Sequence, residues 1–224
     1  MSHICINNLS KIYNPDKPNA FYALKNIHLE IEPSEMVILK GVSGSGKSTL
    51  LSLIGGLGKP SEGEILVNEQ NIAKLPDIMS SHYRHHEVGF IFQSFHLLEA
   101  LSVEHNVMAP LALLNISAKE RDEKVMKAMQ IAHIKHKKEQ IVAHLSGGEK
   151  QRCAIARALV MEPSIILADE PTANLDQQNS LLFLESLKTL KALKKTVIVA
   201  THDTLFDDVD FVDRYVHMRD GKIH

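Results

Sequence analysis

The stretch Gly41-Val-Ser-Gly-Ser-Gly-Lys47-Ser48 follows a short apolar run, Met36 to Leu39, and precedes Thr49 to Ile54, which can continue as a helix. Its spacing is G-x-x-x-x-G-K-S/T, in which the glycines let backbone N–H groups turn inward around phosphate oxygens. A helix that begins where the loop ends adds the partial positive charge of its N-terminus. A glycine-rich turn without a ligand is the alternative, and the coincidence of motif, strand and helix favours a phosphate site.

Two side chains of this loop have the chemistry to bind the β- and γ-phosphates of a nucleoside triphosphate and its Mg²⁺. The Lys47 ammonium can neutralise the β- and γ-phosphates, and the Ser48 hydroxyl can ligate Mg²⁺. A second apolar run, Ser164 to Ala168, ends in the adjacent carboxylates Asp169 and Glu170. Asp169 can hold Mg²⁺ directly or through a water, and Glu170 can polarise a water for in-line attack on the γ-phosphate. The alternative for Glu170 is a solvated carboxylate at a helix start.

A third apolar run, Thr196 to Ala200, completes a set of three strands. All three are apolar on both faces, as in the strands of a covered parallel sheet. Between the last two lies Gln177 to Lys195, where leucine recurs at every third position from Leu181 to Leu193 and predicts an amphipathic helix. The strand–helix–strand unit indicates an α/β core. The residues that end or follow these strands, including Asp169 and His202, are expected to converge on one crevice.

The rest of the chain differs from this core. Three short segments look like strands of a small antiparallel sheet: Ile4 to Leu9, Ile27 to Ile31 and Glu64 to Val67. From about Phe95 to Leu145 the pattern is mostly helical, and Ser117 with Glu120 fits a capping box that opens a helix through about Ile131.

We therefore predict an α/β fold, with a P-loop nucleoside-triphosphatase core of mostly parallel sheet. An N-terminal antiparallel β-subdomain and an inserted α-helical subdomain complete it. Residues 1–224 form a single domain in this interpretation. The core and the β-subdomain occupy about 1–94 and 151–224, and the helical subdomain occupies about 95–150.

The composition argues against other classes of protein. The 224 residues carry 25 Lys and Arg against 27 Asp and Glu, a net charge of −2, and aromatic residues make up only 5%. A nucleic-acid binder would show a basic excess or more aromatic side chains, so we expect no nucleic-acid partner. No apolar run approaches the ~20 residues of a membrane span, and Met1 to Leu9 lacks the features of a signal peptide. These absences predict a cytoplasmic chain.

Cysteine and histidine do not supply an obvious metal-ligand set. Cys5 and Cys153 lie far apart in apolar segments, and both are expected to be small buried hydrophobic residues. Histidine is abundant, at 13, and includes His82-x-x-His85-His86. A metal site and a titratable, solvated surface are the two interpretations of this cluster. Because no cysteine or paired carboxylate completes a ligand set, the solvated surface is favoured.

Leu145-Ser-Gly-Gly-Glu-Lys-Gln-Arg152 stands directly before an alanine-rich segment, Cys153 to Met161, which is expected to be helical. Ser146 is a good N-cap, and Gly147 and Gly148 expose backbone N–H groups at a helix start, which makes an anion site without a phosphate of its own. A merely structural capped helix is the alternative. The stretch resembles the signature sequence of the ATP-binding cassette (ABC) ATPases, and the resemblance covers nearly the whole chain.

The resemblance implies roles for residues that their chemistry alone would not single out. Tyr13 fits the aromatic residue that stacks on adenine, with Phe21 and Tyr22 as competing candidates. Gln93 fits the glutamine that links Mg²⁺ and the attacking water to the helical subdomain. His202 fits the histidine that contacts the γ-phosphate.

The resemblance also implies how two chains assemble. Asn174-Leu-Asp176 fits the loop that crosses to the opposite subunit. The anion missing from the signature sequence is then the γ-phosphate held on the opposite chain, so that a two-fold homodimer sandwiches two ATP molecules. The implied catalytic residues are Glu170, His202 and Gln93, and the implied Mg²⁺ ligands are Ser48, Gln93 and Asp169. The implied ATP-binding residues are Tyr13, Gly41, Val42, Ser43, Gly44, Ser45, Gly46, Lys47, Ser48, Thr49, Ser146, Gly147, Gly148 and Asp176.

Three segments resemble one branch of this family, which contains lipoprotein-releasing (LolD-like), macrolide-exporting (MacB-like) and division-associated (FtsE-like) ATPases: Asn14 to Ala20, Gly89 to Phe95, and Ala168 to Asp176. The branch implies a separate FtsX-, LolC- or MacB-like integral membrane permease, with the chain peripheral on the cytoplasmic face of the inner membrane. We expect an ATP-hydrolysing subunit that powers a permease of the lipoprotein-release or macrolide-export type. The alternative is an FtsE-like regulatory ATPase that signals through a membrane partner without transport.

Two further features carry expectations. The resemblance places Phe95, Leu97, Leu98 and Leu101 at the groove that receives a cytoplasmic helix of the permease. Burial in the core of the helical subdomain is the alternative for each of them. Lys40, directly before the phosphate loop, departs from the small or apolar residue that is commoner there. It either places a second cation near the phosphates or points into solvent.

Overall fold

The computed structural model describes residues 3–224, so Met1 and Ser2 of the N-terminal segment lie outside the described residues. The strands of the larger sheet are β3 (Met36–Lys40), β6 (Val88–Ile91), β7 (Ile165–Asp169), β8 (Thr196–Thr201), β9 (Arg214–Arg219) and β10 (Lys222–Ile223). The strands of the smaller sheet are β1 (Ile4–Tyr13), β2 (Phe21–Ile31), β4 (Glu62–Val67) and β5 (Gln70–Asn71). The α-helices are α1 (Lys47–Ile54), α2 (Asp77–Glu87), α3 (Val103–Met108), α4 (Ala118–Ile131), α5 (Gly147–Leu159) and α6 (Gln177–Ala192). The 3₁₀ turns are η1 (Ile72–Lys74), η2 (Ala109–Leu113), η3 (Lys135–Lys137), η4 (Val142–His144) and η5 (Thr204–Phe206).

The larger sheet has the order β10-β9-β3-β8-β7-β6 and is parallel except for β10. The predicted α/β core with a mostly parallel sheet is confirmed. Its central strands β3 and β8 are buried along their whole length because apolar layers cover both faces, which explains their unbroken Val, Ile and Leu runs. β9 and β10 were not predicted, since they lie at the edge, where only alternate side chains such as Val216 and Met218 are buried.

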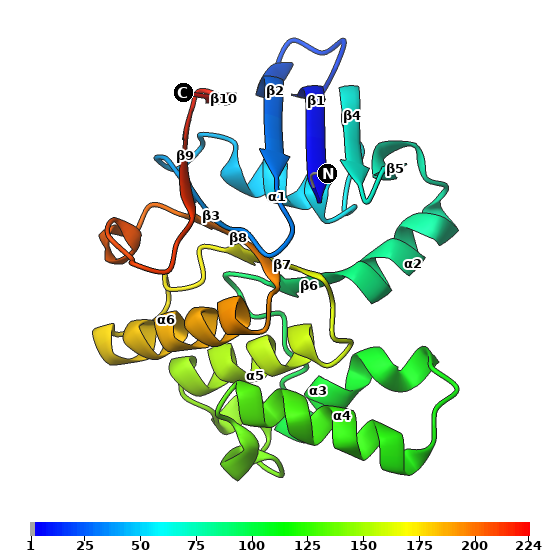
Figure 1. Ribbon diagram of the computed structural model, residues 1–224, viewed down its shortest axis with the longest axis vertical. Helices are drawn as coiled ribbons and strands as arrows, with labels where there is room; N and C mark the ends of the chain where they lie inside the picture. Colours follow the sequence, from blue (N-terminus) through cyan, green and yellow to red (C-terminus); the bar gives the residue numbers. More distant parts are fainter. Residues whose placement is uncertain (1–2) are drawn as a thin grey trace.

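The smaller sheet, in the order β2-β1-β4-β5, is antiparallel, as predicted for the N-terminal segments. In Figure 1 it forms the upper layer, and α1 lies between it and the larger sheet. One apolar core fills this space, with Ile6 of β1, Leu50 of α1 and Leu39 of β3 among its members.

The opposite face of the larger sheet is covered by helices (Figure 1). Successive residues of β3 point to opposite faces, so Leu39 joins the core around α1 while Ile38 joins a second core. This second core includes Val107 of α3, Met129 of α4 and Ile155 of α5.

The helix predicted between the last two core strands is α6, and its leucines do not share one face. Leu187 and Leu190 are buried, whereas Leu181 and Leu193 are 49% and 45% exposed. A spacing of three falls short of the 3.6 residues of a helical turn, so each successive leucine is rotated away from the previous one. Phe183 completes the buried face instead.

The segment from Phe95 to Leu145 is helical, as predicted, and contains α3, η2, α4, η3 and η4. Ser117 caps α4 by accepting a hydrogen bond from the Glu120 N–H at 3.1 Å, and α4 ends at Ile131. α5 begins at Gly147 with Ser146 as its N-cap, as predicted, so the signature sequence forms the first turns of the helix that continues through the alanine-rich segment. None of the helices in residues 3–224 is long and apolar enough to cross a membrane.

Candidate active site

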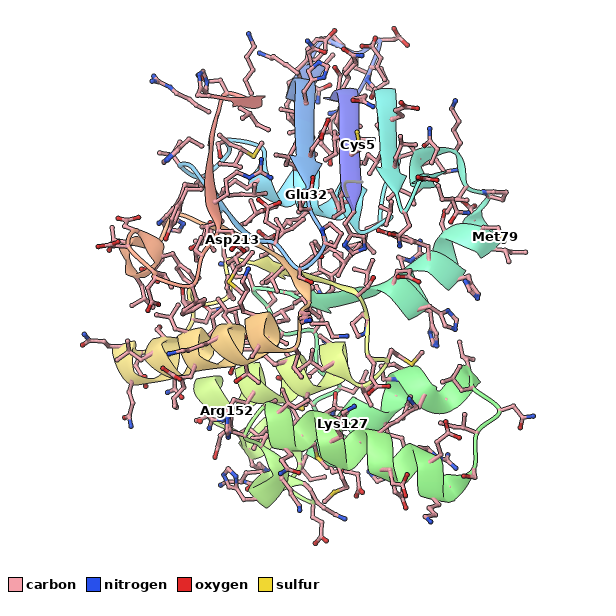
Figure 2. The ribbon with its side chains drawn as sticks, in the orientation of Figure 1. Cys5, Glu32, Met79, Lys127, Arg152 and Asp213 are labelled. Carbon is pink, nitrogen blue, oxygen red and sulfur yellow. The ribbon has the colours of Figure 1, made fainter. Side chains whose placement is uncertain are left out.

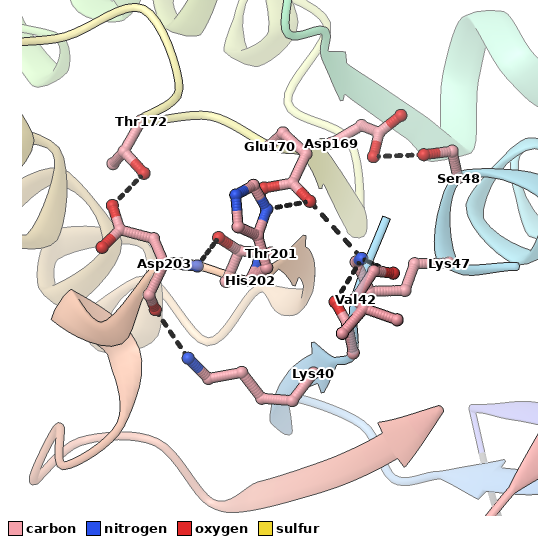
Figure 3. A network of polar contacts seen from close by, with 11 residues as sticks. Lys40, Val42, Lys47, Ser48, Asp169, Glu170, Thr172, Thr201, His202 and Asp203 are labelled. Carbon is pink, nitrogen blue, oxygen red and sulfur yellow. Dashed lines mark hydrogen bonds and ion pairs between the residues drawn. The ribbon is translucent and has the colours of Figure 1, made fainter. Parts of the chain in front are cut away.

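The carboxyl ends of β3, β8 and β7 meet at one edge of the larger sheet, because these strands are parallel neighbours. There Glu170 Oε1 lies 2.9 Å from His202 Nδ1 and 3.4 Å from Lys47 Nζ (Figure 3). The Ser48 hydroxyl donates a hydrogen bond to Asp169 Oδ1 at 2.8 Å. The predicted convergence of these residues on one crevice is thus present in the fold.

The conformation of the phosphate loop depends on its last glycine, Gly46, and on hydrogen bonds from Lys47 to the loop backbone. Gly46 has a φ of 104°, and a Cβ there would lie 2.6 Å from the carbonyl oxygen of Ala23 in β2, so only glycine fits. α1 begins at the next residue, Lys47. Lys47 Nζ donates to the carbonyl oxygens of Gly41 and Val42 at 2.7 and 3.2 Å, so the loop curves around the ammonium group.

A cavity of about 310 Å³ opens over this loop. Its lining residues are Tyr13, Phe21, Tyr22, Ala23, Ser43, Gly44, Ser45, Gly46, Lys47, Ser48, Thr49, Gln93 and Glu170. All three aromatic candidates for stacking on adenine therefore line one cavity. Tyr13 and Phe21 stack on each other with ring centroids 5.5 Å apart, so this cavity has an aromatic end opposite its polar loop.

Asp169 and Ser48 provide the hard oxygen ligands that Mg²⁺ prefers. Burial raises the pKa of the Asp169 carboxyl, as does the charge of Glu170, while the Ser48 hydrogen bond and Lys47 lower it. A divalent cation held by Ser48 and Asp169 would offset the cost of the buried carboxylate. The residues at this edge therefore fit both a nucleoside triphosphate and its Mg²⁺.

Glu170 adopts a left-handed backbone conformation, with a φ of 43°. Its N–H donates to the carbonyl oxygen of Ala200 at 2.8 Å, which ties it to the end of β8. Its side chain is only 14% exposed. Backbone strain of this kind persists where the surroundings impose it, and it is common at functional sites.

The remaining predicted residues do not line this cavity. Val42 is 70% exposed, and its carbonyl and that of Gly41 hold Lys47. His202 is hydrogen-bonded to Glu170, and Asp169 is hydrogen-bonded to Ser48; Glu170 and Ser48 both line the cavity. Ser146, Gly147, Gly148 and Asp176 lie elsewhere in the chain's own fold.

The signature sequence forms a complete capping box at the start of α5. Ser146 Oγ accepts from the Glu149 N–H at 3.3 Å, and the Glu149 carboxylate accepts from the Ser146 N–H at 2.8 Å. The second of these hydrogen bonds is the main reason that the pKa of Glu149 is lowered. The backbone N–H groups of this helix start are thereby held in a single orientation.

Gly148 packs against the start of α6 through Asn179, a residue that the sequence analysis did not single out. A Cβ at Gly148 would lie 1.8 Å from Asn179 Oδ1. Asn179 Oδ1 accepts from Arg152 at 3.1 Å, and Asn179 Nδ2 donates to the Asp176 carboxylate at 2.9 Å. Asp176 also caps α6 by accepting from the Asn179 N–H. The signature sequence and the Asn174–Asp176 loop thus pack against each other and form one continuous surface.

Lys40 does not follow either expectation. It is only 8% exposed, so it does not point into solvent, and its ammonium turns away from the phosphate loop to Asp203 and Asp207. Those partners lie more than 160 residues away in the sequence, so no local pattern could have indicated them.

Other expectations are met in part. Cys153 is buried, and burial raises its pKa to about 12, but Cys5 on β1 is partly exposed (Figure 2). His82 and His86 stack on α2 with ring centroids 4.0 Å apart. His82 and His86 are exposed and His85 is partly exposed, but His85 Nε2 is buried and has no hydrogen-bond partner among residues 3–224. Burial lowers the pKa of His85, and the neighbouring His86 and His82 lower it further.

The segment after Gln93 divides into inward and outward residues. Phe95 and Leu97 are partly buried, and Leu97 packs against the core of the helical segment. Leu98 and Leu101 are 53% and 39% exposed. Burial in the core is therefore excluded for these last two leucines, which are free to contact a partner.

A parallel sheet with a phosphate loop, an adjacent carboxylate pair and a histidine at the same edge defines a P-loop nucleoside triphosphatase. A family model described as "ABC transporter" matches residues 24–173. The lipoprotein-releasing system ATP-binding protein LolD of Pseudoalteromonas translucida is 38% identical over 221 residues, which cover 98% of this chain and 94% of that protein. The macrolide export ATP-binding/permease protein MacB of Chlorobium luteolum is 39% identical over 202 residues, which cover 90% of this chain and 30% of that protein.

A solved structure agrees with these sequence matches. The ATP-binding cassette MJ0796 of Methanocaldococcus jannaschii, in a dimeric post-hydrolysis state bound to ADP and Pi, has a TM-score of 0.89 and 37% identity, covering 99% of this chain and 96% of that one. The chain belongs to the ABC transporter family. It is an ATP-hydrolysing, ATP-binding subunit that works with a membrane permease.

Proposed function

We propose that Glu170 is the general base of hydrolysis and that the residues around it hold ATP and Mg²⁺. The observation that carries this proposal is the shared Glu170 Oε1, 2.9 Å from His202 Nδ1 and 3.4 Å from Lys47 Nζ. These contacts orient one carboxylate oxygen toward the cavity, where it can accept a proton from an attacking water. Lys47 and the loop N–H groups bind the phosphates, and His202 contacts the γ-phosphate.

In this proposal Ser48 and Asp169 would hold Mg²⁺, and Gln93 would contact both the metal and the attacking water. The support for Ser48 and Asp169 is their 2.8 Å hydrogen bond at the mouth of the loop. The support for Gln93 is its place in the cavity lining. Asn174 Nδ2 also donates to the carbonyl of Gln93 at 2.9 Å, which ties Gln93 to the loop before Asp176.

The active form is a two-fold dimer. Ser146, Gly147 and Gly148 present a capped helix start that lies outside the chain's own ATP cavity. A second copy supplies the missing anion if the γ-phosphate on one chain meets the signature sequence of the other. The dimeric state of the cassette MJ0796 supports this assembly for a close relative in fold.

The permease partner is of the lipoprotein-release or macrolide-export type, and the chain sits on the cytoplasmic face of the membrane. The names of the LolD and MacB relatives support this branch. Residues 95–150 act as the helical subdomain that receives the permease. Leu98 and Leu101 support this role, since exposed leucines beside Gln93 suit helix-in-groove docking.

A polar change at Leu98 tests the permease contact. Leu98→Asp is expected to abolish stimulation of ATPase activity by the co-purified permease and to leave the basal activity of the isolated chain unchanged. Leu181→Asp is the matched control, because Leu181 has a similar exposure, 49% against 53%, and lies on α6, outside the segment of Leu98. Full stimulation of the Leu98 variant at normal stability would place the docking surface elsewhere.

A further inference from the structure

Lys40 is a buried cation at the last position of β3, directly before the phosphate loop. The four residues before it in this strand, Met36 to Leu39, are apolar and fully buried, as the covered parallel sheet requires. An ammonium group at such a position loses its hydration and is stable only if it is paired. The groups that pair with the Lys40 ammonium therefore indicate its role in the protein.

Both partners belong to the segment that follows the site histidine. Lys40 Nζ donates to the carbonyl oxygen of Asp203 at 2.6 Å and forms an ion pair with Asp207 Oδ1 at 2.5 Å. Figure 3 shows the long Lys40 side chain reaching from the end of β3 across the edge of the sheet to Asp203. Asp203 is the residue after His202, so Lys40 holds the Asp203–Thr204 peptide, one residue beyond that histidine.

The Phe206 N–H also donates to the Asp203 carbonyl oxygen, at 3.3 Å, and the Leu205 N–H donates to Asp203 Oδ1 at 2.9 Å. Two threonines restrain Asp203 further. Its N–H donates to Thr201 Oγ1 at 3.0 Å, and its carboxylate accepts from Thr172 Oγ1 at 2.7 Å (Figure 3). Thr172 lies just after Glu170 in the turn that follows β7. Lys40, Thr201 and Thr172 thus tie the ends of β3, β8 and β7 to a single residue.

His202 itself has few restraints of its own. Its side chain is 62% exposed, and its contacts in the described structure are with Glu170, through Nδ1 at 2.9 Å and through its N–H at 3.4 Å. The orientation of this imidazole therefore depends on the backbone of residues 201–203. A displaced Asp203 carbonyl would rotate that backbone and move the ring relative to Glu170.

We propose that Lys40 is a positioning residue for ATP hydrolysis, which holds the Asp203 carbonyl and thereby sets the His202 ring against Glu170. The ammonium does not touch the nucleotide site and acts through the histidine. The proposal rests on the role proposed above for His202. This role would explain why a lysine stands at this position, because burying an apolar side chain there would cost less desolvation free energy than burying an ammonium group.

The test compares Lys40→Met with Lys191→Met. Lys191 is the matched control, because its Nζ also donates to a carbonyl, that of Ser34 at 3.1 Å, and pairs with a carboxylate, that of Asp213. These partners precede β3 and β9, at the opposite edge of the sheet from the site, and Asp213 is labelled in Figure 2. We expect Lys40→Met to lower kcat about tenfold while KM for ATP and Kd for ADP change less than about twofold. Lys191→Met should leave all three constants unchanged.

A double-mutant cycle with His202→Ala separates positioning from a general loss of structure. If Lys40 acts through the histidine, Lys40→Met lowers single-turnover hydrolysis in the parent and has almost no effect in the His202→Ala background. An equal loss in both backgrounds would overturn the proposal, as would an unchanged kcat in Lys40→Met. Parental activity of His202→Ala itself would instead refute the role proposed for the histidine.

Asp207→Asn keeps the test decisive if Lys40→Met does not fold. Asp207 has a 57% exposed side chain, so its substitution leaves the core intact and weakens only the ion pair. We expect a loss in kcat of about two- to threefold that again disappears in the His202→Ala background. Unchanged kcat in this folded variant would count against the proposal.

Discussion

Asn106→Ala perturbs the turn that carries the two exposed leucines of the proposed docking segment. Asn106 lies on α3 and has no exposed surface. Its Oδ1 accepts from the Leu98 N–H at 2.7 Å, and its Nδ2 donates to the carbonyl oxygens of Leu98 and Ser102 at 3.0 Å each. One buried amide therefore satisfies the backbone at both ends of the 98–102 turn.

The structure gives a magnitude for this substitution. Each of the three hydrogen bonds contributes about 1 kcal/mol net, so removing them is expected to lower the free energy of unfolding by about 3 kcal/mol. In a chain of this size 1 kcal/mol corresponds to about 2–4 °C, so Tm should fall by about 6–12 °C. Asn115→Ala is the matched control, since Asn115 is exposed in the same helical segment, and it should change Tm by less than about 1 °C.

Urea unfolding and calorimetry measure the loss, and hydrogen exchange of residues 98–102 locates it. We also expect weaker stimulation by the permease, because Leu98 and Leu101 lose their fixed orientation, while basal hydrolysis below the new Tm stays near the parental rate. A loss of less than about 1 kcal/mol would contradict this prediction, since it would mean that apolar packing or water replaces these hydrogen bonds.

The other predictions concern the nucleotide, the dimer and the signature sequence. Glu170→Gln is expected to bind ATP and to hydrolyse it about 10²–10⁴-fold more slowly, whereas Lys47→Ala weakens nucleotide binding itself; parental turnover in the first variant would exclude Glu170 as the base. Light scattering should show a dimer of the Glu170 variant with ATP and a monomer with ADP, and an equally stable ADP dimer would contradict bridging by the γ-phosphate. Gly148→Ala should displace Asn179, lower Tm by about 2–6 °C and prevent the ATP dimer, and an unchanged Tm would show that the asparagine moves freely. Glu149→Gln should cost about 0.5 kcal/mol at neutral pH. Because the N-cap N–H lowers the pKa of this carboxyl, its stabilisation is present above the pKa of the unfolded chain and is lost as pH falls through the folded pKa, so parent and variant should converge in acid.

The parts of this protein that depend on neighbours a few positions apart could be predicted from the sequence. The phosphate loop needs Gly46 at a φ of 104° beside Lys47, and the caps at Ser117 and Ser146 each join residues three apart. The strands β3, β7 and β8 were evident because burial on both faces demands unbroken apolar runs. Each of these features depends on residues within one turn or one strand, so it is visible in the local sequence.

Contacts between residues far apart in the sequence depend on how the elements pack in three dimensions. The order β3-β8-β7 brings Lys40 to Asp203, and the packing of α5 on α6 brings Gly148 to Asn179. The burial of Asn106 and the exposure of Leu98 likewise depend on how α3 packs against the loop that precedes it. The physical reason is that a buried polar group takes whichever partner the packed elements bring within about 3 Å, and sequence separation does not constrain that choice.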